Sequence, residues 1–168
     1  MAWTSPRTWV DGEQETAAIL NTHIRDNFKA IGDPWTTYVP ALTATTTNPT
    51  LGTGAIATGA YTQMGKRVEG WARIQFGSSM AAGTGNYLLS LPVTALNVTQ
   101  RLNGISRLYD SSANAMAQPH PLLNTTTTVQ FLYPSAWPSG TQTNVGAAAP
   151  WAWAQSDELT LTFVYEAA

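Results

Sequence analysis

The chain has 168 residues, a formal net charge of −2 and a pI near 5.5, and its length suits one domain or one domain with an arm. This balance provides no basic field for nucleic acid and no polybasic patch for an acidic membrane, and no apolar run approaches the roughly 18 residues of a membrane span. The absence of cysteine excludes disulfides and thiolate chemistry. Only 11% of the residues are charged, and a surface so poor in charge is typical of a subunit covered by partners or by copies of itself.

Residues 1–12 are expected to form an extended arm. Pro6 opposes a helix there, and the arm carries two indoles, Trp3 and Trp9. A free terminus rarely buries two indoles unless it is tied down. We therefore expect the arm to dock, either on the chain's own domain or on a larger particle.

The stretch TAAILNTHIRDNFKAIGDP, residues 16–34, predicts one short α-helix with a defined start and end. Thr16 is placed to cap the first amides, Glu13 and Glu15 lie near the positive end of the helix, and Gly32 before Asp33-Pro34 ends it. Apolar residues recur at spacings of three and four along one side: Ala17, Leu20, Ile24, Phe28 and Ile31.

Two heptads are too few for a convincing coiled coil, so two arrangements stay open for this helix. It either forms a short trimeric bundle or lies in a groove of a neighbour. We expect residues 1–34 to serve particle attachment and oligomerisation, and the residues assigned to that role are Trp3, Trp9, Leu20, Ile24, Phe28 and Ile31.

From residue 35 to residue 168 the pattern changes to short β-type runs separated by Gly, Pro and Asn. The segment RVEGWARIQF, residues 67–76, alternates between the two faces of a strand, and so does LTLTFVY, residues 159–165. Turn-rich segments lie between these runs, as at the ends of a sandwich. We predict a mainly β chain, with an antiparallel, jelly-roll-like β-sandwich over residues 35–168.

The ionisable residues do not indicate catalysis. His23 and His120 are the only histidines and have no partner at a metal-ligand spacing. The carboxylates of the β region are scattered, and the adjacent pair Asp157-Glu158 points to opposite faces of a strand. Neither a nucleophile elbow nor a phosphate-binding loop is present. We therefore expect no enzyme activity, no catalytic residue, no metal and no cofactor.

The seven tryptophans allow two interpretations, a glycan platform or packing anchors. In APWAWAQS, Trp151 and Trp153 alternate with alanine and point to the same side of an extended segment, so we expect both to pack. Trp137, between PSA and PSG, and Tyr133 are the candidate glycan contacts.

Five stretches in order resemble a family of small virion proteins of tailed bacteriophages, chiefly phages of actinobacteria. They are TWVDGEQETAAILNTHIRDN, WTTYVPALTATTTNPTLGTG, YTQMGKRVEGWARIQFG, GTGNYLLSLP and PWAWAQSDELTLTFVYEAA, and together they cover nearly the whole chain. In that family a short N-terminal segment and helix attach to the particle, and a β-sandwich, typically trimeric, projects outward. Its members are described as capsid decoration, head-fibre or minor tail proteins.

The resemblance implies a homotrimeric structural protein of a virion, made in the host cytoplasm and expected on the capsid surface rather than on the tail. Its partners would be the major capsid protein or tail proteins, with neither nucleic acid nor membrane. The alternative is a minor tail or receptor-binding module that recognises a host-surface glycan. The family has no established catalytic residues, so none is transferred to this chain.

Overall fold

The computed structural model describes residues 4–99, 102–134 and 141–168. A helical segment comes first, made of α1 (Ala17–Leu20), a single π-helical stretch η1 (Asn21–Arg25) and α2 (Asp26–Gly32). The strands that follow are β1 (Thr36–Tyr38), β2 (Leu42–Ala44), β3 (Ile56–Met64), β4 (Arg67–Gln75), β5 (Tyr87–Ser90), β6 (Ser106–Asp110), β7 (Ala115–Ala117), β8 (His120–Thr125), β9 (Thr128–Pro134), β10 (Gln142–Asn144) and β11 (Glu158–Glu166).

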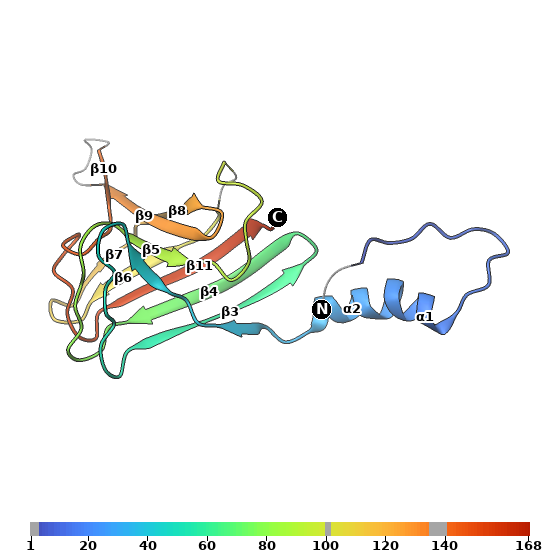
Figure 1. The fold of residues 1–168 in the computed structure, drawn as a ribbon, viewed down its shortest axis with the longest axis horizontal. Coiled ribbons are helices and arrows are strands. Elements are labelled where there is room, and N and C mark those ends of the chain that lie inside the picture. Colours follow the sequence, from blue (N-terminus) through green and yellow to red (C-terminus); the bar gives the residue numbers. More distant parts are fainter. Residues whose placement is uncertain (1–3, 100–101, 135–140) are drawn as a thin grey trace.

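The strands form two antiparallel sheets that lie one against the other (Figure 1). One sheet has six strands in the order β1-β3-β4-β11-β6-β7, and the other has the order β10-β9-β5-β2 with β8 paired to β9. The last strand, β11, lies between β4 and β6, so the C-terminal part of the chain completes the centre of the larger sheet. The predicted mainly β sandwich is confirmed.

The core lies between the two sheets and follows the alternation that the sequence predicts. On β4 the inward positions include Val68 and Ile74, which are fully buried, and their outward neighbours are not. Gly70 also points inward, where a Cβ atom would lie 2.6 Å from the ring of Phe163 on β11. Large side chains from both sheets fill the space between them: Phe76, Tyr87, Leu89, Leu108, Val129, Phe131, Leu159, Leu161 and Phe163.

The helix begins and ends where the sequence places its boundaries. Thr16 is extended and its Oγ1 accepts a hydrogen bond from the amide of Ile19 at 3.3 Å, as an N-cap does. Asp33, just after Gly32, returns to an extended conformation. The sequence did not predict η1, where the amide of Asp26 donates to the carbonyl of Asn21. Such an insertion rotates the residues after it by about 100° relative to an uninterrupted α-helix.

The arm folds back along the helix, and we call residues 4–32 the N-terminal hairpin. Asn27 is buried and holds the arm by its side chain, which bonds both backbone groups of Thr4. Further along the arm, the carbonyl of Ser5 lies 3.3 Å from Nδ1 of His23, and Arg7 pairs with Glu13. The arm thus docks on its own helix, along the side that carries polar residues.

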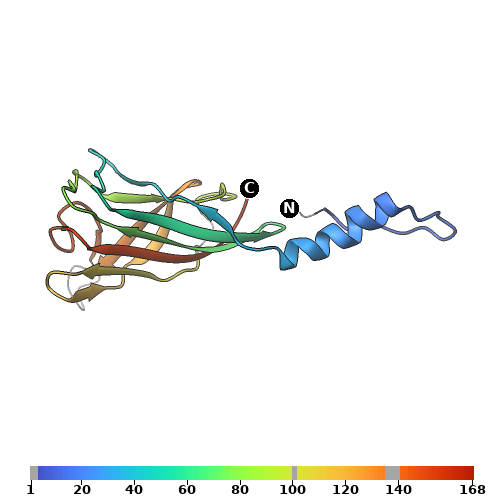
Figure 2. The ribbon, with the colours of Figure 1, turned by 90° about the horizontal axis from the view of Figure 1, so that it is seen from below.

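The N-terminal hairpin extends away from the sandwich, as two perpendicular views show (Figures 1 and 2). It joins the sandwich through residues 33–35 and touches it mainly where α2 meets β3. A cavity of about 580 Å³ lies at this junction, lined by residues that include Ala30, Tyr61 and Lys66. None of the helices in the described ranges is long and apolar enough to cross a membrane.

Candidate functional site

The N-terminal hairpin leaves an apolar surface exposed. We call Ile24, Phe28 and Ile31 the helix stripe. Their exposed fractions are 43%, 72% and 56%. The side of the helix that the arm covers is instead the one that carries Asn27 and Ala30. Since this side is the only buried one, the stripe has no cover within the described part of the chain.

The other residues assigned to attachment lie differently. Leu20 is half-buried and directly precedes η1. Trp9 is 41% exposed, with the guanidinium of Arg7 centred 5.0 Å from its ring centroid. Trp3 lies outside the described residues.

The second exposed surface is the outer face of the six-stranded sheet, made of the side chains that point away from the core. The strand register arranges them in rows that cross the sheet. From the end of the sheet far from the N-terminal hairpin, the first three rows are Ile56–Gln75–Glu158–Tyr109–Met116, Thr58–Arg73–Thr160–Arg107 and Ala60–Trp71–Thr162 with Ile105 beside Thr162.

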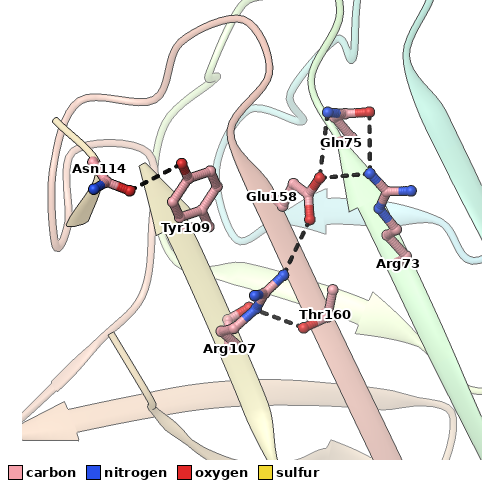
Figure 3. Close-up of polar contacts among 7 residues, drawn as sticks. All are labelled: Arg73, Gln75, Arg107, Tyr109, Asn114, Glu158 and Thr160. Atoms are coloured by element: carbon pink, nitrogen blue, oxygen red, sulfur yellow. Dashed lines mark hydrogen bonds and ion pairs between the residues drawn. The ribbon is translucent and has the colours of Figure 1, made fainter. Parts of the chain in front are cut away.

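A polar cluster occupies the first two rows (Figure 3). Glu158 lies between two arginines: its Oε1 is 2.5 Å from Nη2 of Arg73 and its Oε2 is 3.4 Å from Nη2 of Arg107. Gln75 donates to the same carboxylate at 3.3 Å and accepts from Arg73 at 3.4 Å. Two guanidinium groups and one carboxylate leave this cluster with one net positive charge.

The carboxylate of the cluster is the covered group and the guanidinium groups are the accessible ones. The Glu158 side chain is 14% exposed, against 36% for Arg73 and 45% for Arg107. Arg107 is also held from its other side, because its guanidinium carbon lies 6.0 Å from the ring centroid of Tyr109. Both arginines therefore have partners that hold them in place, and both keep part of their side chain accessible.

Trp71 lies in the next row, on the same strand as Arg73 and two residues from it. Its indole is 39% exposed, and its cross-strand neighbours Ala60 and Thr162 are small. Side chains two residues apart on one strand are separated by about 7 Å. The outer face thus places an accessible aromatic ring beside an accessible pair of cations.

The two most buried carboxylates of the sandwich accept hydrogen bonds from residues of the loops. Asp157 is fully buried and accepts hydrogen bonds from the amide and hydroxyl of Ser111 and from the amide of Ala154. Asp110 accepts from the amide of Ala113 and from Ser112, and these bonds lower the pKa of its carboxyl group. Asp110 thus accepts from donors of its own turn, whereas Asp157 joins its turn to the one that follows β6.

The aromatic residues near the loops differ in how deeply they are buried. Trp153 is buried against Phe76 and Tyr87, and its Nε1 donates to the carbonyl of Gly146 at 2.9 Å. Trp151 is half-buried and its ring centroid lies 6.0 Å from that of Trp153, so both indoles pack as the sequence predicts. Tyr133 on β9 is half-buried against the core. Trp137 lies outside the described residues.

The two histidines lie in different parts of the chain. His23 faces the arm, and His120 begins β8 in an exposed position. In the described parts of the chain, no group of three or more His, Cys, Asp or Glu side chains is arranged to hold a metal ion.

The sequence shows Trp71, Arg73 and Gln75 on the outward face of one strand, but it does not show Arg107 and Glu158 beside them. Those two residues come from β6 and β11, and only the register of three strands brings them together. A comparison of the chain with known protein families, curated proteins and solved structures found no match.

Proposed function

We propose that this chain is a structural subunit of a bacteriophage virion, which attaches to the particle through its N-terminal hairpin and carries the sandwich outward. The observation that carries the proposal is the exposed helix stripe on a hairpin that extends away from the sandwich. An exposed apolar stripe of this kind is covered in the functional state, either by copies of the same chain or by another protein.

The form that we favour is a homotrimer on the capsid surface that acts by attachment and packing. The low charge of the chain and its resemblance to virion proteins of tailed phages support this form. Stripes from three hairpins would cover one another, or each stripe would lie in a groove of a neighbouring capsid subunit. A minor tail location is the alternative, with tail proteins as partners in place of the major capsid protein.

A difference map between virions with and without the chain tests the proposal. We expect density for the hairpin at the particle surface and density for the sandwich farther out, with three copies around a threefold axis. A sandwich seated directly on the particle with the hairpin pointing outward would contradict the proposal. Density at the tail and none at the head would select the minor tail form.

A further inference from the structure

We propose that the outer face of the six-stranded sheet binds an acidic saccharide, with a sugar ring on Trp71 and its carboxylate on Arg73 and Arg107. This inference goes beyond the structural role, because it concerns a surface that lies on the sandwich and away from the N-terminal hairpin. It rests on three features of that face: its charge, its aromatic ring and their spacing.

The charge of the cluster fits an anion. Glu158 is the single acid among the outward side chains of the first two rows, and it satisfies only part of the donors of two guanidinium groups. A guanidinium binds a carboxylate through paired hydrogen bonds, which are among the stronger polar contacts in proteins. A ligand carboxylate would therefore complete the arrangement and neutralise its net positive charge.

The positions of the arginines are set before any ligand arrives. Glu158 draws both toward β11, Gln75 contacts Arg73, and the Tyr109 ring lies beside Arg107 (Figure 3). Side chains fixed in this way lose less conformational entropy when a ligand binds than free surface arginines do. The cluster thus has the preorganisation that a binding site needs.

The aromatic ring selects a sugar over a simple anion. Trp71 offers an exposed indole to the apolar face of a ring, and small neighbours on both adjacent strands leave space around it. Arg73 lies about 7 Å from Trp71 along the same strand, and Arg107 lies in the row of Arg73, two strands across and about 10 Å from it. These spacings suit one or two sugar units with an acidic group.

The same face offers less to a protein partner. Its exposed apolar residues, Trp71, Ile105 and Met116, are separated by threonines and by the charged cluster. A protein interface usually has a contiguous apolar core that is depleted of charge. We therefore favour the saccharide, and association with a second copy is an outcome that the test can reveal.

The test is a glycan array that carries uronic-acid and sialic-acid oligosaccharides, with their methyl esters and neutral analogues printed beside them. The full chain should bind acidic members and lose binding to the methyl esters, which keep the ring and remove the charge. Calorimetry with the best binder should show weaker binding at higher salt. Binding to no acidic member, or equal binding to the esters, would overturn the proposal.

Substitutions of single residues test whether the saccharide binds at this cluster. Arg107→Gln and Arg73→Gln should each weaken binding about tenfold, the effect of one lost hydrogen bond to a charged group. Arg67→Gln is the matched control, since Arg67 lies on the same face and strand but pairs with Glu69. Its affinity should equal that of the native chain. Unchanged affinity in both cluster variants would show that the saccharide does not bind to this face.

Trp71→Ala should also weaken binding, and Trp71→Phe should retain most of it because the ring remains. Melting curves followed by circular dichroism check that each variant is folded. If only the arginine variants lose binding, the face holds an anion without a sugar, and the proposal fails. If Trp71→Ala instead separates an oligomer in light scattering, the face is a contact between copies, and the proposal fails as well.

Discussion

The side-chain amide of Asn27 forms two hydrogen bonds with the backbone of Thr4. Its Oδ1 accepts from the Thr4 amide at 2.9 Å, and its Nδ2 donates to the Thr4 carbonyl at 2.8 Å. The same Nδ2 also reaches the carbonyl of His23 at 3.1 Å. A buried side chain on the helix therefore satisfies both backbone groups of one arm residue. This pairing fixes the arm against the helix.

We expect Asn27→Ala to release the arm while the sandwich stays folded. The two bonds to Thr4 contribute about 1 kcal/mol each, so the released state should gain roughly 30-fold in population. Trypsin should cleave after Arg7 correspondingly faster, as mass spectrometry of the digest would show. Thr22→Ala, an exposed change on the same helix, is the control and should leave the cleavage rate unchanged.

Asn27→Asp provides an independent check, because it keeps the shape of the side chain and replaces the amide donor by an acceptor. It should release the arm as well, since a carboxylate oxygen would then face the Thr4 carbonyl. An arm that stays protected in both variants would show that other contacts, such as Arg7 with Glu13, hold it.

The sequence predicted features that depend on local pattern. Alternation on β4 and β11 indicated the inward faces, because successive side chains on a strand point to opposite sides. The helix boundaries followed from Thr16 and Gly32, whose roles need only near neighbours. Trp153 packs as its alternation with alanine predicted.

Features that depend on distant contacts could not be predicted. The contact of Arg73 with Glu158 joins residues 85 positions apart, and the strand order alone creates it. The sequence also gave no sign of η1, because a π-helical stretch has no composition that sets it apart from the α-helix around it. For that reason the sequence predicts one uninterrupted α-helix over residues 16–34, and the structure divides it into α1, η1 and α2.

Phe28→Glu should abolish self-association and particle attachment. Burial of a phenylalanine contributes about 1.5–3 kcal/mol for each copy, and a buried unpaired charge would oppose contact further. Light scattering at micromolar concentration would measure the mass, and co-sedimentation with particles would measure attachment.

Thr22→Glu is the control for Phe28→Glu, because it adds the same charge at an exposed position of the same helix outside the helix stripe. It should behave as the native chain does. A Phe28→Glu variant that keeps the native mass and still attaches would show that the stripe is not the contact surface.

Gly83→Ala should destabilise the sandwich far more than Gly54→Ala. Both glycines have positive φ, +69° and +75°, so both changes carry the left-handed backbone penalty of about 1–2 kcal/mol. A Cβ at Gly83 would also lie 2.2 Å from the carbonyl oxygen of Thr47, whereas a Cβ at Gly54 would meet nothing within 4 Å. The difference between the melting temperatures of the two variants measures the destabilisation that the close contact at Gly83 causes, because the backbone penalty is common to both. Equal melting temperatures would contradict the close approach.

The free energy of unfolding should fall as the pH rises above about 10, because three tyrosines are held neutral in the folded chain. Burial raises the pKa of the phenols of Tyr38, Tyr87 and Tyr165 well above the ordinary value. Unfolding brings these pKa values back to about 10, so at higher pH the unfolded chain binds fewer protons than the folded one. Each such tyrosine then lowers the stability by up to about 1.4 kcal/mol per pH unit, and below pH 10 it has no effect of this kind.

Tyr87→Phe isolates one of these groups. It keeps the ring in the core and removes both the ionisable hydroxyl and its hydrogen bond of 2.8 Å to the carbonyl of Ala82. The variant should therefore be less stable than the native chain at pH 8, by about 1 kcal/mol, yet lose less stability between pH 8 and pH 11. Urea unfolding at the two pH values measures both differences, and absorbance at 295 nm should report tyrosinate appearing together with unfolding. If the native chain and Tyr87→Phe lose the same free energy over this range, the Tyr87 hydroxyl does not contribute to the alkaline instability.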